Sequence, residues 1–252
     1  MADDSPFCSP LARKLGAYVV LSEKELTVLE DLHRRRRSFG SGRDLVYQGQ
    51  PNQSAFILAQ GWVCSYKNLR DGTRQIVDIQ IPGDFLGLRS VLFRAADHNI
   101  APITKIEASK VHSDELFAAF SSTPRLATAI LWAASRDEAM VVEHLVDLGR
   151  RNALERTAHF LLELGARLKL VGLGSSEGYA CPLSQYMLAD ALGLTATHIS
   201  RVLRHLREEN LLTFKDGAVT FLDLGRLVER ADFDKAYLDQ AEQTENKLPY
   251  HS

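Results

Sequence analysis

The chain has 252 residues, which exceeds one average domain and favours two domains over a single large core. Hydrophobic residues make up 45% of the chain and charged residues 25%, a balance typical of globular proteins that excludes a disordered or fibrous chain. The net charge is −2 and the pI is near 6.5, so any prediction of nucleic-acid binding must rest on local charge and spacing.

Membrane insertion and secretion are not expected, because the apolar stretches are short and the first ten residues are acidic without a basic start. A cytoplasmic location is therefore predicted. The three cysteines, Cys8, Cys64 and Cys181, lie far apart without a CxxC pair, which argues against a zinc knuckle and a disulfide framework. We expect reduced thiols.

The first 22 residues show no sustained periodicity, and we expect a mobile arm or a short helix there. Ser22, followed by Glu23 and Glu25, is a helix-start signal. From Phe39 to about Val111, short apolar runs alternate with glycines. Strands are predicted around 55–58, 62–66 and 75–81, with a tight turn at 71–72, which is typical of an antiparallel sandwich or jelly roll.

A long helix is predicted from about 121 to 150, with one repeating stripe on it. The spacing of the stripe alternates between three and four residues, which favours packing of the helix against its twin in a homodimer. The alternative is that the stripe packs on the β domain of its own chain. The stripe consists of Leu131, Ala134, Glu138, Val141, Leu145 and Leu148. Within it, Glu138 is expected to fix the register of the pair at some cost in stability.

A hinge is predicted near 149–153, followed by a second helix over 154–170 and a glycine-rich loop or turn between strands over 171–178. Two further helices then follow closely. Ser184 caps a helix that runs through Leu192, Gly193 permits the positive φ of a sharp turn, and Thr195 caps the next helix. This pattern predicts a helix-turn-helix.

The second helix of this motif keeps one face polar, with donors that read base edges and neutralise phosphates. After Asn210, two short apolar runs flank Asp216-Gly217, and the resulting hairpin is similar to a wing. The polar face consists of Thr197, His198, Ser200, Arg201, Arg204 and Arg207. Such helical pairs also arise by chance or in protein-interaction domains, but the combination of caps, turn glycine and wing favours DNA binding.

Across roughly residues 20–230 the chain resembles the Crp-Fnr family, that of the cyclic-AMP receptor protein and the FNR regulators. The resemblance rests on Gly72, Arg74 and Gln75, on the segments 82–87 and 155–158, and on Ser200 with Arg201. It implies an α+β protein with an N-terminal double-stranded β-helix (jelly-roll) sensor domain, a long dimerisation helix and a C-terminal winged helix-turn-helix. The expected segments are an arm at 1–22, the sensor at 23–120, the dimerisation helix at 121–150, the DNA-binding domain at 151–235 and a tail at 236–252.

The residues that hold cyclic AMP in this family are replaced here. Leu88 stands where nucleotide binders have a glutamate after the glycine, and residues 98–100 stand where they have an Arg-Ser pair. Without that arginine a cyclic phosphate lacks its charge-assisted partner, so cyclic AMP is disfavoured. An iron-sulfur cluster is disfavoured as well, because only Cys8 and Cys64 lie in the N-terminal region.

Haem is disfavoured too, because isolated histidines are more often surface or hydrogen-bonded residues. The histidines concerned are His33, His98, His112 and His144. No cofactor is therefore expected, and the effector is not identified by the sequence.

The resemblance also implies roles in DNA recognition. Arg201 matches the arginine that reads guanine, and Thr197 replaces a glutamate that accepts from cytosine, so base selection there is expected to differ. His198 and Ser200 are further candidates for base readout. Contacts to backbone phosphate are assigned to Ser184, Gln185, Thr195 and Arg204.

The expected partners are double-stranded DNA with an inverted repeat, a second copy of the chain, and RNA polymerase. One alternative is a cupin-like jelly-roll enzyme, but His98 and His112 lack the paired spacing that places two metal ligands on one strand face. Another is a module that has lost DNA binding, against which Arg201, Arg204 and the wing argue. Oxidation of Cys64 or Cys181 as a switch, and inert structural thiols, are both compatible with the sequence.

Overall fold

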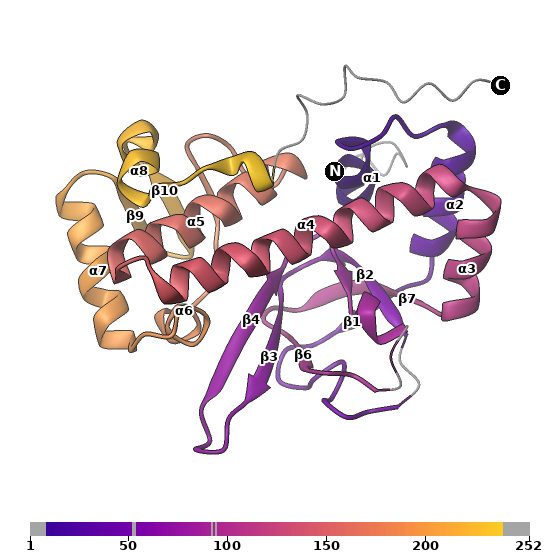
Figure 1. Cartoon of the computed structure of the whole chain (residues 1–252), viewed down its shortest axis with the longest axis horizontal. Coiled ribbons are helices and arrows are strands. Elements are labelled where there is room, and N and C mark those ends of the chain that lie inside the picture. The colour runs from indigo at the N-terminus through magenta and orange to yellow at the C-terminus, as the bar shows by residue number, and fades with distance from the viewer. Residues whose placement is uncertain (1–8, 52–53, 92, 94, 239–252) are drawn as a thin grey trace.

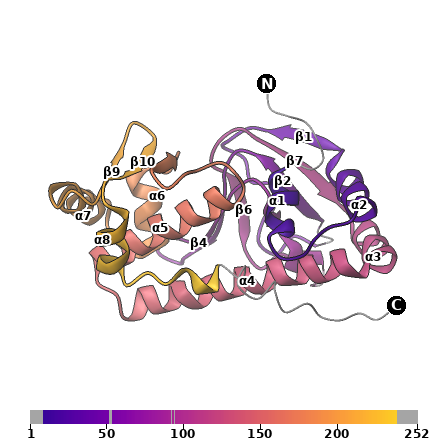
Figure 2. The same ribbon diagram turned by 90° about the horizontal axis from the view of Figure 1, so that it is seen from above.

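The computed structural model describes residues 9–51, 54–91, 93 and 95–238. A β domain and a helical domain lie at the two ends of the molecule, and one long helix, α4, runs past both of them (Figure 1). Viewed from above, α4 forms one edge of the molecule, and α5 lies beside it (Figure 2). The helices of the N-terminal half are α1 (Pro10–Gly16), α2 (Glu23–His33), α3 (Ser113–Ser122) and α4 (Pro124–Gly149).

The β domain consists of two antiparallel sheets, with strand orders β1-β7-β2-β5 and β4-β3-β6. This arrangement confirms the jelly-roll prediction. Its elements are β1 (Arg36–Phe39), β2 (Ala55–Gln60), β3 (Val63–Asn68), β4 (Arg74–Gln80), β5 (Phe85–Leu86), the 3-10 turn η2 (Leu88–Val91), β6 (Asn99–Pro102) and β7 (Ile106–Val111). Alternate strand residues fill the space between the sheets, among them Leu58, Val63 and Ile100.

The N-terminal segment is not a mobile arm where the structure describes it. From Pro10 it forms α1, whose Leu11 and Leu15 are buried in the core of the β domain. Lys14 is also buried, and its Nζ lies 2.7 Å from Asp84 Oδ1. The short-helix alternative is therefore confirmed for this part, whereas residues 1–8 lie outside the described residues.

The long helical region begins with a break that the sequence pattern did not predict. Helix α3 ends before Thr123, and α4 starts with Pro124 at its first position. The break follows from the proline, because its ring disfavours the helical conformation at the preceding residue. Helix α4 has 26 residues, or roughly 39 Å at the usual rise per residue.

The C-terminal domain packs α5 (Ala153–Leu170) against a small sheet and three shorter helices. The predicted loop over 171–178 follows α5 and leads into a strand, and an isolated antiparallel bridge joins Gly174 to Tyr179 across its turn. The remaining elements are β8 (Gly178–Ala180), α6 (Gln185–Leu192), α7 (Ala196–Glu208), β9 (Leu212–Lys215), β10 (Ala218–Phe221), α8 (Leu224–Ala231) and η3 (Lys235–Tyr237). None of the described helices is long and apolar enough to cross a bilayer.

The two domains share one buried junction. Ile76 and Ile79 of β4 belong to the same apolar cluster as Leu188 and Leu192 of the helical domain. Beside this cluster the guanidinium of Arg167 is buried and donates to Asp84 Oδ2 at 2.9 Å and to Ile79 O at 2.8 Å. Because Asp84 also binds Lys14, one carboxylate joins α1, the β domain and α5.

Candidate nucleic-acid interface

Helix α6 starts and ends at the residues that the sequence predicted. The Ser184 hydroxyl accepts the Met187 N–H at 3.2 Å, and Gly193 ends the helix in the left-handed region with φ 62°. A Cβ atom at Gly193 would lie 3.2 Å from Leu148 Cδ2. The conformation and the close approach of α4 therefore both favour glycine at this turn.

Helix α7 is strongly amphipathic. The Thr195 hydroxyl caps it by accepting the His198 N–H at 3.2 Å. Its apolar side chains are buried against α6 and α5, and they repeat every three or four residues as one helical face requires. They are Ile199, Val202, Leu203 and Leu206.

The opposite face of α7 is exposed and basic. All four predicted base-reading residues lie on it: Thr197, His198, Ser200 and Arg201. Among the described residues, no carboxylate forms an ion pair with Arg201, Arg204 or Arg207. These guanidinium groups therefore keep their donors available for a partner outside the chain.

Two surface grooves flank α7. The first, of about 690 Å³, lies between α7, the N-terminus of α6 and the wing, and it is lined by Ser200, Arg204 and Arg207. The second, of about 610 Å³, lies between α7 and the start of α5, and it is lined by His198 and His205. Thr197 and Arg201 line both grooves, so they form the ridge that would enter a nucleic-acid groove.

The predicted phosphate contacts surround this ridge. Ser184, Gln185, Thr195 and Arg204 are all exposed. The hydroxyls of Ser184 and Thr195 accept backbone N–H groups as helix caps, which leaves each O–H free to donate to a phosphate oxygen. Helix capping and phosphate binding are therefore compatible at these two residues.

Two further residues of the first groove lie beyond the predicted base and phosphate contacts. Tyr186 is 75% exposed at the start of α6, and Lys215 lines the groove from the wing, beside the predicted basic residue Arg207 of α7. The wing turn that carries Lys215 has positive φ at Asp216 and Gly217, as a tight hairpin requires. An aromatic residue two positions after the predicted cap Ser184 was the available signal for Tyr186.

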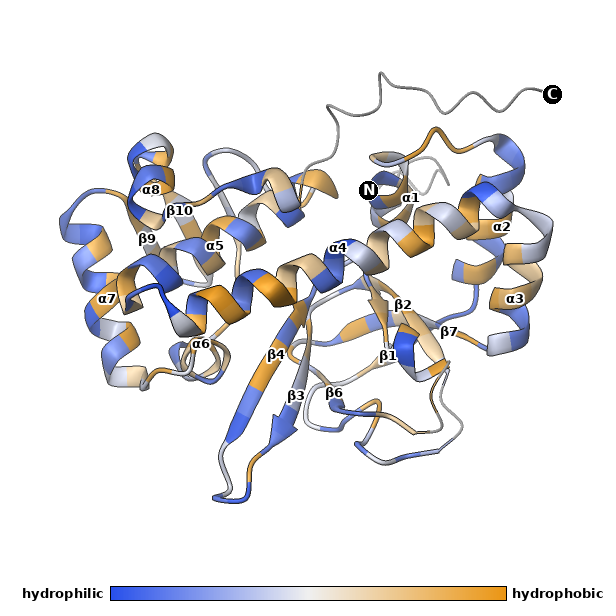
Figure 3. Ribbon diagram, viewed as in Figure 1, coloured by the Kyte–Doolittle hydropathy of each residue, from blue (hydrophilic) through white to orange (hydrophobic). Residues whose placement is uncertain are grey.

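Most of the stripe on α4 faces away from the core of its own chain, although Leu148 at its end lies close to Gly193. Leu131 is 67% exposed and Leu145 is 70% exposed, while the opposite side of α4 is buried through Leu126, Ile130 and Met140. Val141, Leu148 and Glu138 are also exposed, and Ala134 is half-buried. In the C-terminal half of α4, hydrophobic positions alternate with hydrophilic ones (Figure 3). The exposed part of the stripe therefore does not pack on the β domain of its own chain.

The region of the β domain that matches the nucleotide site is occupied by internal hydrogen bonds. His98 Nδ1 lies 2.7 Å from Asp97 Oδ1, and burial lowers the pKa of His98 below its ordinary value. Asn99 Oδ1 accepts the Gln48 N–H at 3.0 Å. Leu88 begins η2 directly after Gly87. Neither His98 nor Asn99 presents a cation to a phosphate.

Cys64 and Cys181 are both buried, and burial raises the pKa of each thiol to about 11. Each is therefore overwhelmingly protonated near neutral pH, which suppresses thiolate chemistry. Within the described residues, no cluster of three histidine, cysteine or acidic side chains is arranged to hold a metal ion.

Comparison with known proteins agrees with both halves of the fold. Residues 36–123 match the cyclic nucleotide-binding domain family, and residues 155–230 match the Crp-like helix-turn-helix domain family. The nitrogen fixation regulation protein FixK of Bradyrhizobium diazoefficiens is 34% identical over 228 residues, covering 88% of this chain and 92% of that protein. The fumarate and nitrate reduction regulatory protein of Vibrio cholerae is 26% identical, with 85% of this chain and 86% of that protein covered.

The solved structure of FixK2 from Bradyrhizobium japonicum has a TM-score of 0.69 and 28% identity, covering 77% of this chain and 95% of that one. With these matches over most of its length, the chain belongs to the Crp-Fnr family of transcription regulators. It is a FixK/FNR-type regulator with a helix-turn-helix DNA-binding domain, and the cupin-like alternative finds no support.

Proposed function

We propose that the protein acts as a homodimer that reads an inverted repeat, with one α7 in each of two successive major grooves. The exposed basic face of α7, with a groove on either side, is the observation that carries this proposal. An α-helix fits the major groove of B-DNA, and half-sites about one helical turn apart suit a two-fold dimer.

Within the interface, Arg201 donates to guanine, while Thr197, His198 and Ser200 contact neighbouring bases. Ser184, Gln185, Thr195 and Arg204 contact the phosphates, which fixes the register of α7 without reading sequence. The exposed position of all these side chains supports this division of roles.

Dimerisation uses the exposed stripe on α4. Apolar side chains as exposed as Leu131 and Leu145 on one face of a 26-residue helix are stabilised by a matching surface. A second copy of α4 supplies such a surface, and the pair then holds the two DNA-binding domains together.

We assign the protein no cyclic AMP, iron-sulfur or haem cofactor and no enzymatic activity. The internal pairing of His98 and Asn99 supports this for cyclic AMP. For haem, His112 Nδ1 lies 3.3 Å from Ser54 Oγ, and His144 is paired with Glu163. From the family resemblance we also propose that RNA polymerase is a partner of the protein and that the protein is located in the cytoplasm.

Selection of bound sequences from random DNA tests the proposal. Untreated wild-type protein is expected to enrich an inverted repeat, and Arg201→Ala is expected to lose enrichment at one base pair of each half-site. Arg226→Ala is a matched control, because this exposed arginine of α8 lies outside both grooves. Enrichment that is identical for the wild type and Arg201→Ala would contradict the assignment of α7.

A further inference from the structure

The hairpin formed by β3 and β4 of the sensor domain contacts α6 of the DNA-binding domain with two polar side chains. Arg74 Nε donates to Asp190 Oδ2 at 2.7 Å, and Gln75 Nε2 donates to Ala191 O at 2.9 Å. Each contact joins residues 116 positions apart in the chain. We call these two contacts the hairpin clasp.

Arg74 is held from its own side of the junction as well. Its guanidinium lies over the Tyr66 ring at 5.3 Å from the ring centre, and the Tyr66 hydroxyl donates to Asp44 Oδ2 at 2.8 Å. The arginine is therefore oriented by the β domain while its Nε binds α6. Such preorganisation reduces the side-chain entropy that the Asp190 contact costs.

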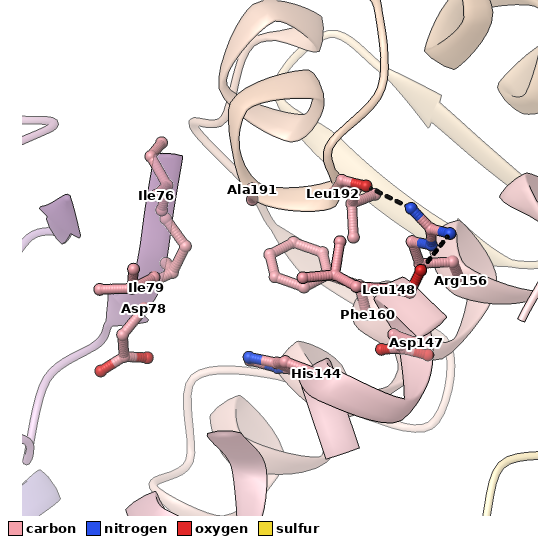
Figure 4. Close-up of a pocket in the computed structure, with 11 residues that line it drawn as sticks. Ile76, Asp78, Ile79, His144, Asp147, Leu148, Arg156, Phe160, Ala191 and Leu192 are labelled. Carbon is pink, nitrogen blue, oxygen red and sulfur yellow. Dashed lines mark hydrogen bonds between the residues drawn. The ribbon is translucent and has the colours of Figure 1, made fainter. Parts of the chain in front are cut away.

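The clasp binds the C-terminal end of α6, where helix carbonyls lack partners within the helix. Gln75 satisfies Ala191 O. Arg156 of α5 satisfies Leu192 O at 2.7 Å and also donates to Leu148 O at 3.3 Å (Figure 4). The positive charges of Arg74 and Arg156 are also favourable beside a helix C-terminus. The end of α6 is thus held by β4 on one side and by α5 on the other.

Apolar side chains also pack across the same junction. Ile76 and Ile79 of β4 face Ala191, Leu192 and Phe160 across a narrow pocket of about 20 Å³ (Figure 4). Helix α6 is in turn fixed to α7 by the Gly193 turn and by the core they share. Any shift of α6 relative to β4 therefore moves α7 together with α6.

We propose that Arg74 and Gln75 are positioning residues for DNA recognition, because they fix α6, and through it α7, relative to the sensor domain and α4. In the dimer this sets the distance between the two recognition helices, and hence the operator spacing that the protein accepts. The inference rests on the proposed dimeric function. Neither side chain lines the grooves beside α7, so neither contacts DNA in this scheme.

Operators with identical half-sites and a variable central spacer test the inference in the full-length protein. Wild type is expected to prefer one spacer length. Arg74→Ala and Gln75→Ala are expected to accept spacers one base pair shorter or longer, and to bind the preferred spacer roughly 3- to 10-fold more weakly, as suits half-exposed polar contacts. The double variant Arg74→Asp with Asp190→Arg exchanges the two charges, and it is expected to restore the wild-type preference for one spacer length. Arg89→Ala is the matched control, because Arg89 pairs with Asp97 within the sensor domain.

Spacer preference separates positioning from folding, because a smaller folded fraction lowers binding to every spacer equally. Gln75→Ala changes no charge and provides the same measurement if an Arg74 variant does not fold. The inference is overturned if the folded clasp variants keep the wild-type preference. A wild type that binds no inverted repeat would instead refute the proposed function, and the inference with it.

Discussion

At the scale of single residues, the exposed face of α7 separates base reading from charge neutralisation. Arg201 lies on the ridge between two grooves, whereas Arg204 lines only the groove next to the wing. A bidentate arginine selects guanine, while an arginine on phosphate contributes affinity to every sequence alike. The two residues are therefore expected to respond differently to substitution.

Arg201→Ala is expected to lower the affinity for the selected operator by about 1–3 kcal/mol and to relax selection at one base pair of each half-site. Arg204→Ala is expected to weaken binding to selected and random DNA alike, and to reduce the slope of log affinity against log salt by about one for each phosphate that is no longer neutralised. Fluorescence anisotropy on both DNAs, at ionic strengths between about 50 and 200 mM, measures the two effects. An equal loss of selectivity in both variants would contradict the division of roles.

At the scale of the element, two features depend on local geometry that the sequence encodes directly. The caps at Ser184 and Thr195 and the turn at Gly193 were predictable, because each arises from a residue and its next few neighbours. The alternating spacing on α4 was predictable for the same reason. The same spacing favoured a stripe that does not pack on the β domain, and the exposure of Leu131 and Leu145 agrees with this. The elements that cover the opposite face of α4 were not predictable, since they lie far away in the sequence.

Gly193→Ala is expected to destabilise the DNA-binding domain by about 1–2 kcal/mol, because alanine disfavours positive φ and its Cβ would crowd Leu148. Gly149→Ala at the end of α4 is the matched control, since nothing lies within 4 Å of its added Cβ. Chemical denaturation of the two variants checks this. An equal stability of the two would show that the turn tolerates a side chain.

Leu145→Asp is expected to convert the protein into a monomer and to abolish tight operator binding, because it places a charge in the stripe on α4. Phe117→Asp introduces the same charge at an exposed apolar residue of α3 and is expected to leave the dimer intact. Sedimentation velocity measures both. A Leu145→Asp protein that remains dimeric would place the dimer contact elsewhere.

At the scale of the whole molecule, long-range contacts determine how the domains are joined, and these were beyond sequence reasoning. Lys14, Asp84 and Arg167 meet across 70 and 83 positions of the chain. No local pattern marks such partners, which is why α1 was expected to be an arm or an isolated helix. Tyr186 and the hairpin clasp were not predicted for a related reason, since their importance depends on which elements lie next to them.

Asp78 makes the junction sensitive to pH. Burial raises the pKa of Asp78 to about 6, against the lowering effect of Arg167. Its carboxyl faces His144 across the pocket (Figure 4). A folded-state pKa above the unfolded value of about 3.9 means that the stability from this group is full below about pH 4 and is lost as the pH rises through about 6.

Asp78→Asn is therefore expected to be more stable than wild type by about 1 kcal/mol at about pH 7.5, and nearly equal to it at about pH 3.5. The expected difference in stability is kept this small because the Asp78 side chain is 28% exposed, and solvent screens its charge. Asp31→Asn, at an exposed carboxylate of α2, is the control. Urea unfolding at the two pH values measures the difference, and a gap of the same size at both values would refute the pH dependence.

The most direct test of the account is the stoichiometry of the complex on the selected operator, measured by sedimentation with untreated wild-type protein. The account predicts two chains on each inverted repeat, and much weaker binding to an isolated half-site on DNA of the same length. One chain per operator, with equal affinity for the half-site, would contradict a dimer that reads DNA through two α7 helices.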